Sequence, residues 1–194
     1  LMDRVIGQAE AYAGASVDQA GKLAMLLADV GAPDTLKLNL PDLIGAVYDP
    51  VAGAYGIVTN TYHQAYALLG LAAYGADIPA QAAQALIALQ QPDGGWKYDL
   101  TEADWNVTTP DNTGLAVQAL LAAGVPADAP SVELAVQYLE STRDSLGGWG
   151  NANATALAAQ ALIASGADCL RWLTPDGRAP LSALAQYGKI DGPL

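Results

Sequence analysis

Polar side chains that could carry chemistry stand at a fixed distance before four glycines of the chain. Thirteen residues before these glycines the sequence has Asp18, Tyr62, Asp111 and Asn153, and twelve residues before them Gln19, His63, Asn112 and Ala154. At helix starts such residues would lie beside free N–H groups and the positive end of the helix dipole. Helix starts that converge on one end of a bundle can hold an anionic or hydroxyl-rich ligand. We therefore expect ligand-binding residues at Asp18, Tyr62, His63, Tyr66, Asp111, Asn112 and Asn153.

A simpler interpretation also applies to these positions. Asp and Asn at a helix start commonly accept hydrogen bonds from the first backbone N–H groups and act as caps. His63, the single histidine of the chain, is equally explained as a half-buried side chain bonded to a neighbouring carbonyl. A third possibility is chemical, because Tyr62 and His63 form a potential acid and base pair.

Four repeated apolar segments must position these residues. The glycines that end the segments are Gly31, Gly75, Gly124 and Gly166, which are 44, 49 and 42 residues apart. A period of about 40–50 residues is typical of stacked helical units or blades. Residues 115–123 are apolar on every side except Gln118, which predicts a helix buried all round. A glycine then suits the left-handed residue that ends each helix.

The pattern predicts alternating inner and outer helices. Inner helices are expected over residues 16–30, 60–74, from the start near Asp111 to Gly124, and over 153–166. Outer helices with one apolar stripe are expected over residues 2–12, 40–48, 79–91, 130–143 and 180–187. Ser16 or Asp18 should cap the first inner helix, and Asp111 or Asn112 the third. Residues 49–56 read as a turn-rich loop.

The bulk properties restrict the class of protein. The chain has 194 residues, 52% of them hydrophobic and 14% charged, which predicts one ordered domain over residues 1–194. A net charge of −12 argues against nucleic acid and anionic membrane surfaces as partners. The sequence has no apolar run long enough for membrane insertion. Because the sequence starts at Leu1, we expect it to be a piece of a longer protein. Because it contains one cysteine, Cys169, we expect no internal disulfide.

The alternating helices resemble the α/α-toroid superfamily, which includes triterpene cyclases, prenyltransferase β-subunits and cobalamin carriers. Bacterial proteins with prenyltransferase/squalene-oxidase-type repeats are particularly similar. The segment from Leu86 through Gln90-Gln91-Pro92-Asp93-Gly94-Gly95 to Trp96 is similar to the repeat turn of that family, and the segment from Tyr138 to Trp149 is a weaker copy. The resemblance covers nearly the whole chain and implies an all-α toroid, partial or complete. It is specific for the fold and weak for function.

One stretch is similar to the catalytic motif of the cyclases. Thr109-Pro110-Asp111-Asn112-Thr113-Gly114 lies where those enzymes have Asp-x-Asp-Asp-Thr-Ala. The resemblance would make Asp111 the acid that protonates an alkene. However, Thr109 and Asn112 replace the flanking acids that tune such a proton donor. The chain also has no Phe, whereas cyclase cavities are lined with aromatics that stabilise carbocations.

A second stretch is similar to a zinc-binding helix. Residues 62–71, Tyr-His-Gln-Ala-Tyr-Ala-Leu-Leu-Gly-Leu, match a helix of prenyltransferase β-subunits in which the histidine binds zinc. The carried-over ligand is His63, and Asp111 could supply a second. Thr113 stands where the family has its cysteine, and zinc is rarely held by so few good ligands. We therefore expect no metal and no cofactor.

The tryptophans divide into two kinds. Trp96 and Trp149 each follow a Gly-Gly turn, where an indole can close the gap between neighbouring outer helices, so both are interpreted as structural. Trp105 lies outside the repeat, in a long loop that also carries Glu102 and Asp104. Exposed aromatics in such loops often serve binding, and we include Trp105 among the candidate ligand-binding residues.

Two functions follow from these residues. The degraded motifs favour a non-catalytic ligand-binding or scaffold module of a secreted or cell-envelope protein, whose partner is a small molecule, a glycan or a protein. Export is implied by the resemblance alone. The alternative is an enzyme on the toroid scaffold, either related to terpene cyclases and prenyltransferases or a polysaccharide lyase. In that case His63 and Asp111 are the candidate catalytic residues, with Tyr62 as the acid of a lyase.

Overall fold

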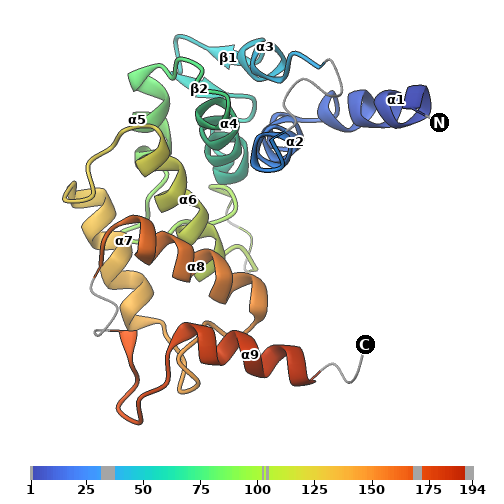
Figure 1. Cartoon of the computed structure of the whole chain (residues 1–194). Coiled ribbons are helices and arrows are strands. Elements are labelled where there is room, and N and C mark those ends of the chain that lie inside the picture. The colour runs from blue at the N-terminus through green and yellow to red at the C-terminus, as the bar shows by residue number, and fades with distance from the viewer. Residues whose placement is uncertain (1, 32–37, 102, 104, 168–171, 191–194) are drawn as a thin grey trace. The chain divides into compact units, whose positions relative to one another are not determined.

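The computed structural model describes residues 2–31, 38–101, 103, 105–167 and 172–190. The chain is all-α, of the α/α-toroid class that the sequence predicted, and the described residues also include one small hairpin (Figure 1). The helices are α1 (Met2–Ala13), α2 (Val17–Asp29), α3 (Leu40–Gly45), α4 (Thr61–Ala73), α5 (Ala80–Ala88), α6 (Pro110–Ala122), α7 (Pro130–Ser141), α8 (Ala152–Ala164) and α9 (Pro180–Ile190). The sequence interpretations that involve Glu102, Asp104 and Cys169 lie outside the described residues.

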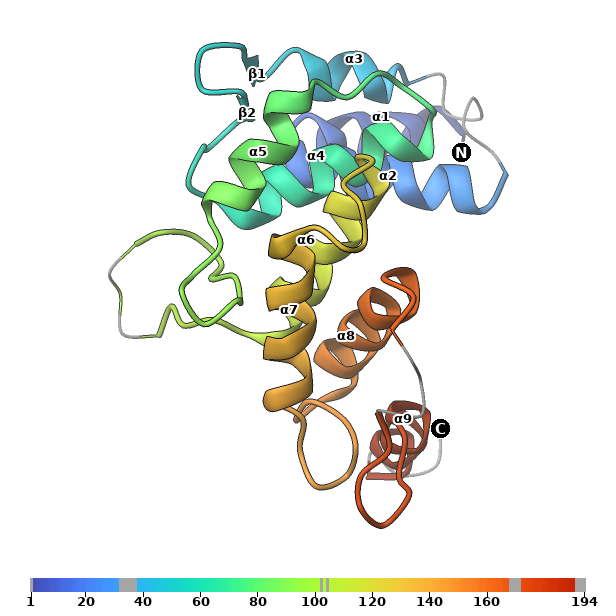
Figure 2. The ribbon, with the colours of Figure 1, turned by 90° about the vertical axis from the view of Figure 1, so that its left-hand side faces the viewer.

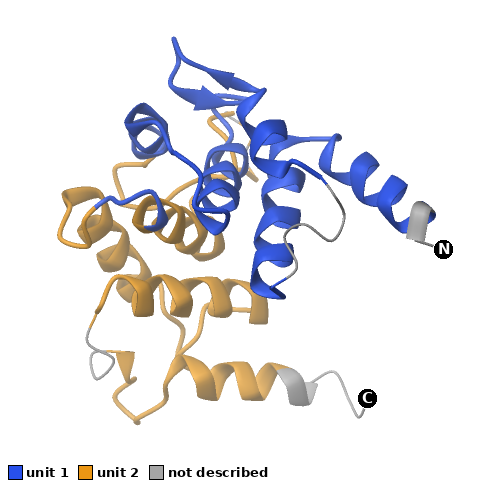
Figure 3. Cartoon of the chain, turned by 45° about the horizontal axis from the view of Figure 1, so that its top comes forward, with its two compact units in different colours: residues 1–89, 122–125 blue, residues 90–121, 126–194 orange. Residues whose placement is uncertain are grey.

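Contacts between Cα atoms divide the chain into two compact units (Figure 3). Unit 1 comprises residues 1–89 and 122–125, and unit 2 comprises residues 90–121 and 126–194. The four predicted stop glycines have the positive φ that a left-handed helix end requires: Gly31 at 66°, Gly75 at 62°, Gly124 at 84° and Gly166 at 70°. The repeat that the glycine spacing predicted is therefore present in both units.

In unit 1 the inner helices α2 and α4 pack side by side (Figure 1). Gly21 makes this approach possible, because a Cβ atom placed on it would lie 2.1 Å from the backbone oxygen of Tyr66. Gly70 faces Gly21 from α4, and its Cβ would lie 2.7 Å from the Gly21 Cα. The backbones are therefore in direct contact, and this contact brings the first turns of α2 and α4 together.

A hairpin replaces the end of the predicted 40–48 helix and part of the predicted loop. Helix α3 ends at Gly45, and β1 (Tyr48–Asp49) pairs antiparallel with β2 (Ala54–Tyr55). Asp49 stabilises the turn by accepting hydrogen bonds from the N–H groups of Val51 and Ala52. The fully buried Gln64 of α4 then bonds both the N–H and the carbonyl of Tyr55, each at 2.8 Å. A buried amide with these partners holds the hairpin against the inner helix.

In unit 2 helices α6 and α8 meet in the same way. A Cβ on Gly114 would lie 2.6 Å from the backbone carbonyl of Leu157, and Gln118 Nε2 donates to the Leu157 carbonyl at 3.2 Å. Gly114 and Gly21 both stand ten residues before a stop glycine, while Leu157 and Tyr66 stand nine before one. The repeat therefore reproduces one backbone contact in both units. The outer helix α9 packs against α8.

Each inner helix after the first anchors the turn that precedes it. Thr113 Oγ1 accepts from the Trp96 N–H at 3.1 Å, and Thr155 Oγ1 accepts from the Trp149 N–H at 2.9 Å. Trp96 is 0% exposed and Trp149 is 4% exposed, which confirms their structural role. Tyr55 occupies the corresponding place in front of α4, with Gln64 as the acceptor. The hairpin is thus a third copy of the repeat turn. The sequence did not reveal it, because Tyr55 stands where the other two turns have a tryptophan.

The predicted caps of α6 and α8 need correction, whereas in α2 one of the two predicted residues occupies the cap position. Asn151, not Asn153, caps α8, since its side chain accepts from the Ala154 N–H at 2.9 Å. Helix α6 begins at Pro110, so Asp111 and Asn112 lie inside its first turn rather than before it. Proline suits that position because the first turn needs no N–H from it. In α2 the cap position is Ser16, one of the two residues predicted, and Asp18 lies inside the helix.

Candidate functional site

The first turns of α2 and α4 bring four of the predicted site residues together in unit 1: Asp18, Tyr62, His63 and Tyr66. Asp18 is the centre of this group. Its Oδ2 accepts from Lys22 Nζ at 2.8 Å, and its Oδ1 accepts from Ser16 Oγ at 2.5 Å. Burial opposes ionisation of Asp18 most strongly, but the bonds from Lys22 and Ser16 prevail and lower its pKa below 3.8. Asp18 is therefore a paired carboxylate at neutral pH.

His63 is held in one tautomer by the backbone. Its Nδ1 accepts a hydrogen bond of 2.9 Å from the Ile57 N–H, so the proton of the neutral ring lies on Nε2. Nε2 is 3.9 Å from Asp18 Oδ1. Burial lowers the pKa of His63 below 6.5, the Asp18 carboxylate opposes this shift, and the Lys22 ammonium adds to it. At neutral pH the imidazole is therefore uncharged, and its contact with Asp18 is not an ion pair.

Two tyrosines and a lysine complete the group. The rings of Tyr62 and Tyr66 meet edge to face with centroids 5.5 Å apart. Lys22 Nζ lies 4.5 Å from the Tyr66 ring centroid and 5.4 Å from that of Tyr62. Both distances are within the range of a cation–π attraction. A cation from the protein itself therefore lies against these rings.

The state of His63 makes stability depend on pH. The folded-state pKa lies below the unfolded value of 6.5, so the unfolded chain binds this proton more readily. The His63 contribution is therefore present above about pH 6.5 and is lost as the pH falls through the folded-state pKa. We expect urea midpoints of the protein to fall between pH 7 and pH 5. His63→Asn, which keeps an acceptor for the Ile57 N–H, should flatten that profile, and an equally steep profile in this variant would refute the assignment.

The other four predicted residues lie in unit 2, and no described contact joins them to one another. Asn112 is 5% exposed and Asp111 is partly exposed in the first turn of α6. Asn153 is exposed on α8. Beside α6, Thr108 Oγ1 donates to Asp93 Oδ2 at 2.6 Å. Trp105 is 69% exposed, as expected for a binding residue. The sharing of one ligand by all four helix starts stays a prediction.

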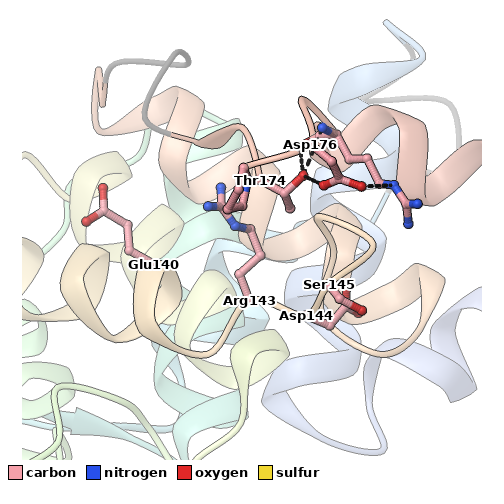
Figure 4. Close-up of a pocket in the computed structure, with 8 residues that line it drawn as sticks. Glu140, Arg143, Asp144, Ser145, Thr174 and Asp176 are labelled. Carbon is pink, nitrogen blue, oxygen red and sulfur yellow. Dashed lines mark hydrogen bonds and ion pairs between the residues drawn. The ribbon is translucent and has the colours of Figure 1, made fainter.

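An open groove in unit 2 was not predicted from the sequence. It has a volume of about 570 Å³ and is lined by charged and hydroxyl groups, among them Glu140, Arg143, Asp144, Ser145, Thr174 and Asp176 (Figure 4). Its two sides are far apart in the sequence, at the end of α7 and before α9. Short motifs therefore give no signal for it. The only hint is that Arg143 and Arg178 are two of just eight basic residues.

The charges of the groove are unequally engaged. Asp176 accepts from Thr174 Oγ1 at 2.6 Å and pairs with Arg178 Nε at 2.9 Å. Asp144 accepts hydrogen bonds from the N–H groups of Gly148 and Gly150 in the turn that follows it. Burial raises the pKa of Asp144, but the backbone hydrogen bonds prevail and lower it. Arg143 extends across the groove toward the Thr174 segment (Figure 4), where it donates to the Leu173 carbonyl at a long 3.3 Å. Its guanidinium is the group best placed to meet an anionic ligand.

The part of the chain that the structure describes has neither a clustered metal site nor a membrane-spanning helix. It contains no group of three or more His, Cys, Asp and Glu side chains arranged to hold a metal ion. None of its helices combines the length and apolar character needed to cross a bilayer.

Similarity to known proteins adds to this geometry. The sequence pattern of the squalene-hopene cyclase C-terminal domain matches residues 49–187, which is more than half of the chain. The match includes α4 and the α6 motif, together with the turns at Trp96 and Trp149 and the hairpin from Asp49 onward. No curated protein matches the chain.

Proposed function

The chain belongs to the squalene-hopene cyclase C-terminal domain family, and on that premise we propose that it is a non-catalytic ligand-binding or scaffold module of a secreted or cell-envelope protein. It is a terpenoid cyclase/prenyltransferase-like repeat domain. The repeat fold supplies a rigid framework, and sites on such folds vary independently of the framework.

The proposal rests on one observation: hydrogen bonds within the protein already occupy the side chains that catalysis would need. His63 Nδ1 accepts from the Ile57 N–H, so the neutral ring presents a proton rather than a lone pair at Nε2. A general base must instead offer a lone pair to the substrate. Both oxygens of Asp18 are also occupied, by Ser16 and Lys22. Thr109 in place of an acid leaves Asp111 without the network that a proton donor to an alkene requires.

A turnover assay separates the proposal from the enzyme alternative. The protein is incubated with prenyl diphosphates, a linear polyene and acidic oligosaccharides, and products are followed by mass spectrometry. We expect no product above the level seen without protein. Turnover that disappears in His63→Ala or Asp111→Asn would overturn the proposal and restore the cyclase, prenyltransferase or lyase interpretation.

The groove lined by Arg143 supports a ligand that combines hydroxyl groups with a carboxylate, such as an acidic glycan. Arginine binds carboxylates with two parallel, charge-assisted hydrogen bonds, and Ser145 adds a hydroxyl. We expect uronate oligosaccharides to bind, with Arg143→Ala weakening binding by roughly tenfold, which is about 1.4 kcal/mol. Isothermal titration calorimetry measures this effect.

Arg4→Ala is the matched control, because Arg4 is an exposed arginine of α1 outside the groove. It removes the same charge and should leave the dissociation constant unchanged. Equal losses in both variants would mean that only the net charge matters, and that result would argue against the groove. Binding that is unaffected by either change would do the same.

A further inference from the structure

The loop that joins Trp96 to Thr109 in unit 2 contains one buried amide in the part that the structure describes. Its ends pair through a bridge, with the Thr109 N–H donating to the Trp96 carbonyl at 3.2 Å. Figure 2 shows that the described residues leading into α6 form neither a helix nor a strand. Asn106 is only 3% exposed, although its neighbours Trp105 and Val107 are 69% and 55% exposed. A polar side chain is thus buried at the centre of an exposed loop.

The partners of this amide do not match its chemistry. Asn106 Nδ2 lies 2.8 Å from the Asp99 carbonyl, 2.9 Å from Asp99 Oδ1, 2.8 Å from the Thr101 carbonyl and 3.1 Å from Thr101 Oγ1. An NH₂ group has two hydrogens, so four oxygens compete for them. On the other side, the buried Asn106 Oδ1 has no hydrogen-bond partner. A buried amide that is oversupplied with acceptors and lacks a donor is a costly arrangement.

A cation resolves the excess of acceptors. An amide turned by 180° exchanges its oxygen and nitrogen, which makes Asn106 Oδ1 the neighbour of four oxygens of Asp99 and Thr101. Ca²⁺ binds oxygens at about 2.3–2.6 Å, so neighbouring ligands of one ion lie roughly 2.8–3.4 Å from each other. The four distances around Asn106 Nδ2, from 2.8 to 3.1 Å, fall within that range. Thr101 Oγ1 also donates to Asp99 Oδ1 at 2.5 Å, so these two oxygens would have to separate by a few tenths of an ångström when they share an ion.

We propose that Asp99, Thr101 and Asn106 form a Ca²⁺ site, with the main-chain and side-chain oxygens of Asp99 and Thr101 and the amide oxygen of Asn106 as ligands. One carboxylate among carbonyl, hydroxyl and amide oxygens suits Ca²⁺, whereas Mg²⁺ keeps most of its water and Zn²⁺ prefers nitrogen and sulfur. The zinc motif centred on His63 is unrelated to this site. The single carboxylate predicts a dissociation constant on the order of 10⁻⁴ M.

The direct test uses Ca²⁺ itself and Tb³⁺ as a luminescent substitute. Trp105 is adjacent to Asn106 in the chain, so tryptophan excitation should sensitise Tb³⁺ held by the loop. We expect Tb³⁺ emission that Ca²⁺ displaces and equimolar Mg²⁺ does not, together with Ca²⁺ binding heat in calorimetry. Absence of binding heat up to millimolar Ca²⁺ would overturn the proposal, as would displacement by Mg²⁺ with equal strength. Asp99→Asn should weaken Ca²⁺ binding by roughly tenfold, whereas Asp49→Asn, in another exposed turn, should not.

Asn106→Asp distinguishes an ion ligand from a hydrogen-bond donor. If the amide serves only as a donor, the new carboxylate faces four acceptor oxygens, and the variant loses stability that no ion restores. If the site binds Ca²⁺, the variant is less stable in chelator but gains more from Ca²⁺ than the original chain does. Thermal melts with and without 5 mM Ca²⁺ (about 50 times the expected dissociation constant) measure the difference. If the melting temperature of the variant is the same with and without Ca²⁺, the proposal is refuted even if the loop still folds.

Discussion

Gly21→Ala is expected to lower the free energy of unfolding by about 2 kcal/mol, although alanine is ordinarily the better helix residue. A Cβ at this position would lie 2.1 Å from the Tyr66 oxygen and 2.6 Å from its carbonyl carbon. Those atoms are backbone, so α2 and α4 would have to move apart. Overpacking of this kind costs about 1–3 kcal/mol or more and exceeds the gain of about 1 kcal/mol in helix propensity.

Gly7→Ala is the matched control for this prediction. Gly7 lies in α1, and a Cβ there would meet no atom within 4 Å. The substitution should therefore stabilise the protein slightly, by about 0.5–1 kcal/mol. Urea unfolding followed by circular dichroism measures both changes. If both variants were stabilised, the close contact of α2 and α4 would not exist. His63 should also report the change, because α2 and α4 together bury it.

Much of the fold could be predicted because it rests on local signals. Glycines at regular intervals end the inner helices, and each of these glycines has the predicted positive φ. The all-round apolar character of residues 115–123 placed a buried helix, and α6 covers all but the last of these residues. Trp96 and Trp149 were recognised as structural from the preceding Gly-Gly turns. Composition, spacing and turn chemistry are visible in one chain without knowledge of distant contacts.

The features that the sequence did not predict depend on contacts between distant residues or on competition between neighbours. The hairpin of Tyr48 and Tyr55 forms because Gln64 of α4 holds it. Asn151 rather than Asn153 is the N-cap of α8, because the helix begins at Ala152. The groove joins Arg143 to Thr174 across 31 residues of sequence. Such pairings carry no local periodicity, so a pattern in the sequence could not show them.

The candidate site in unit 1 illustrates the same limit in chemical terms. Residue types and helix position correctly placed Asp18 beside His63. They could not show that the Ile57 N–H would bond His63 Nδ1, because Ile57 precedes the helix in an irregular segment. Nor could they show that Lys22 would lie against Tyr66 and Tyr62. The residue types permitted acid–base chemistry, and the partners of His63 and Asp18 are what argue against it.

Trp96→Ala is expected to produce the largest loss of stability, about 3–5 kcal/mol. Trp96 is 0% exposed and directly follows the repeat turn. This turn packs closely against α7, because a Cβ placed on Gly94 would lie only 2.4 Å from the backbone oxygen of Leu134. Removing the indole leaves a cavity that a backbone packed this closely cannot collapse to fill. The Trp96 N–H bond to Thr113 survives in alanine, so the effect should come from lost packing.

Trp105→Ala provides the comparison that links stability to function. Because its indole is 69% exposed, we expect a change within about 0.5 kcal/mol. Its loss should instead strongly reduce tryptophan-sensitised Tb³⁺ emission while leaving Ca²⁺ heats in place, since the proposed ligands are its neighbours and not Trp105 itself. Urea unfolding of both variants, with Trp96→Phe as a partial rescue, tests the division. Equal losses from the two alanine variants would show that the exposed loop supports the core, and Trp105 would then no longer be a candidate for binding alone.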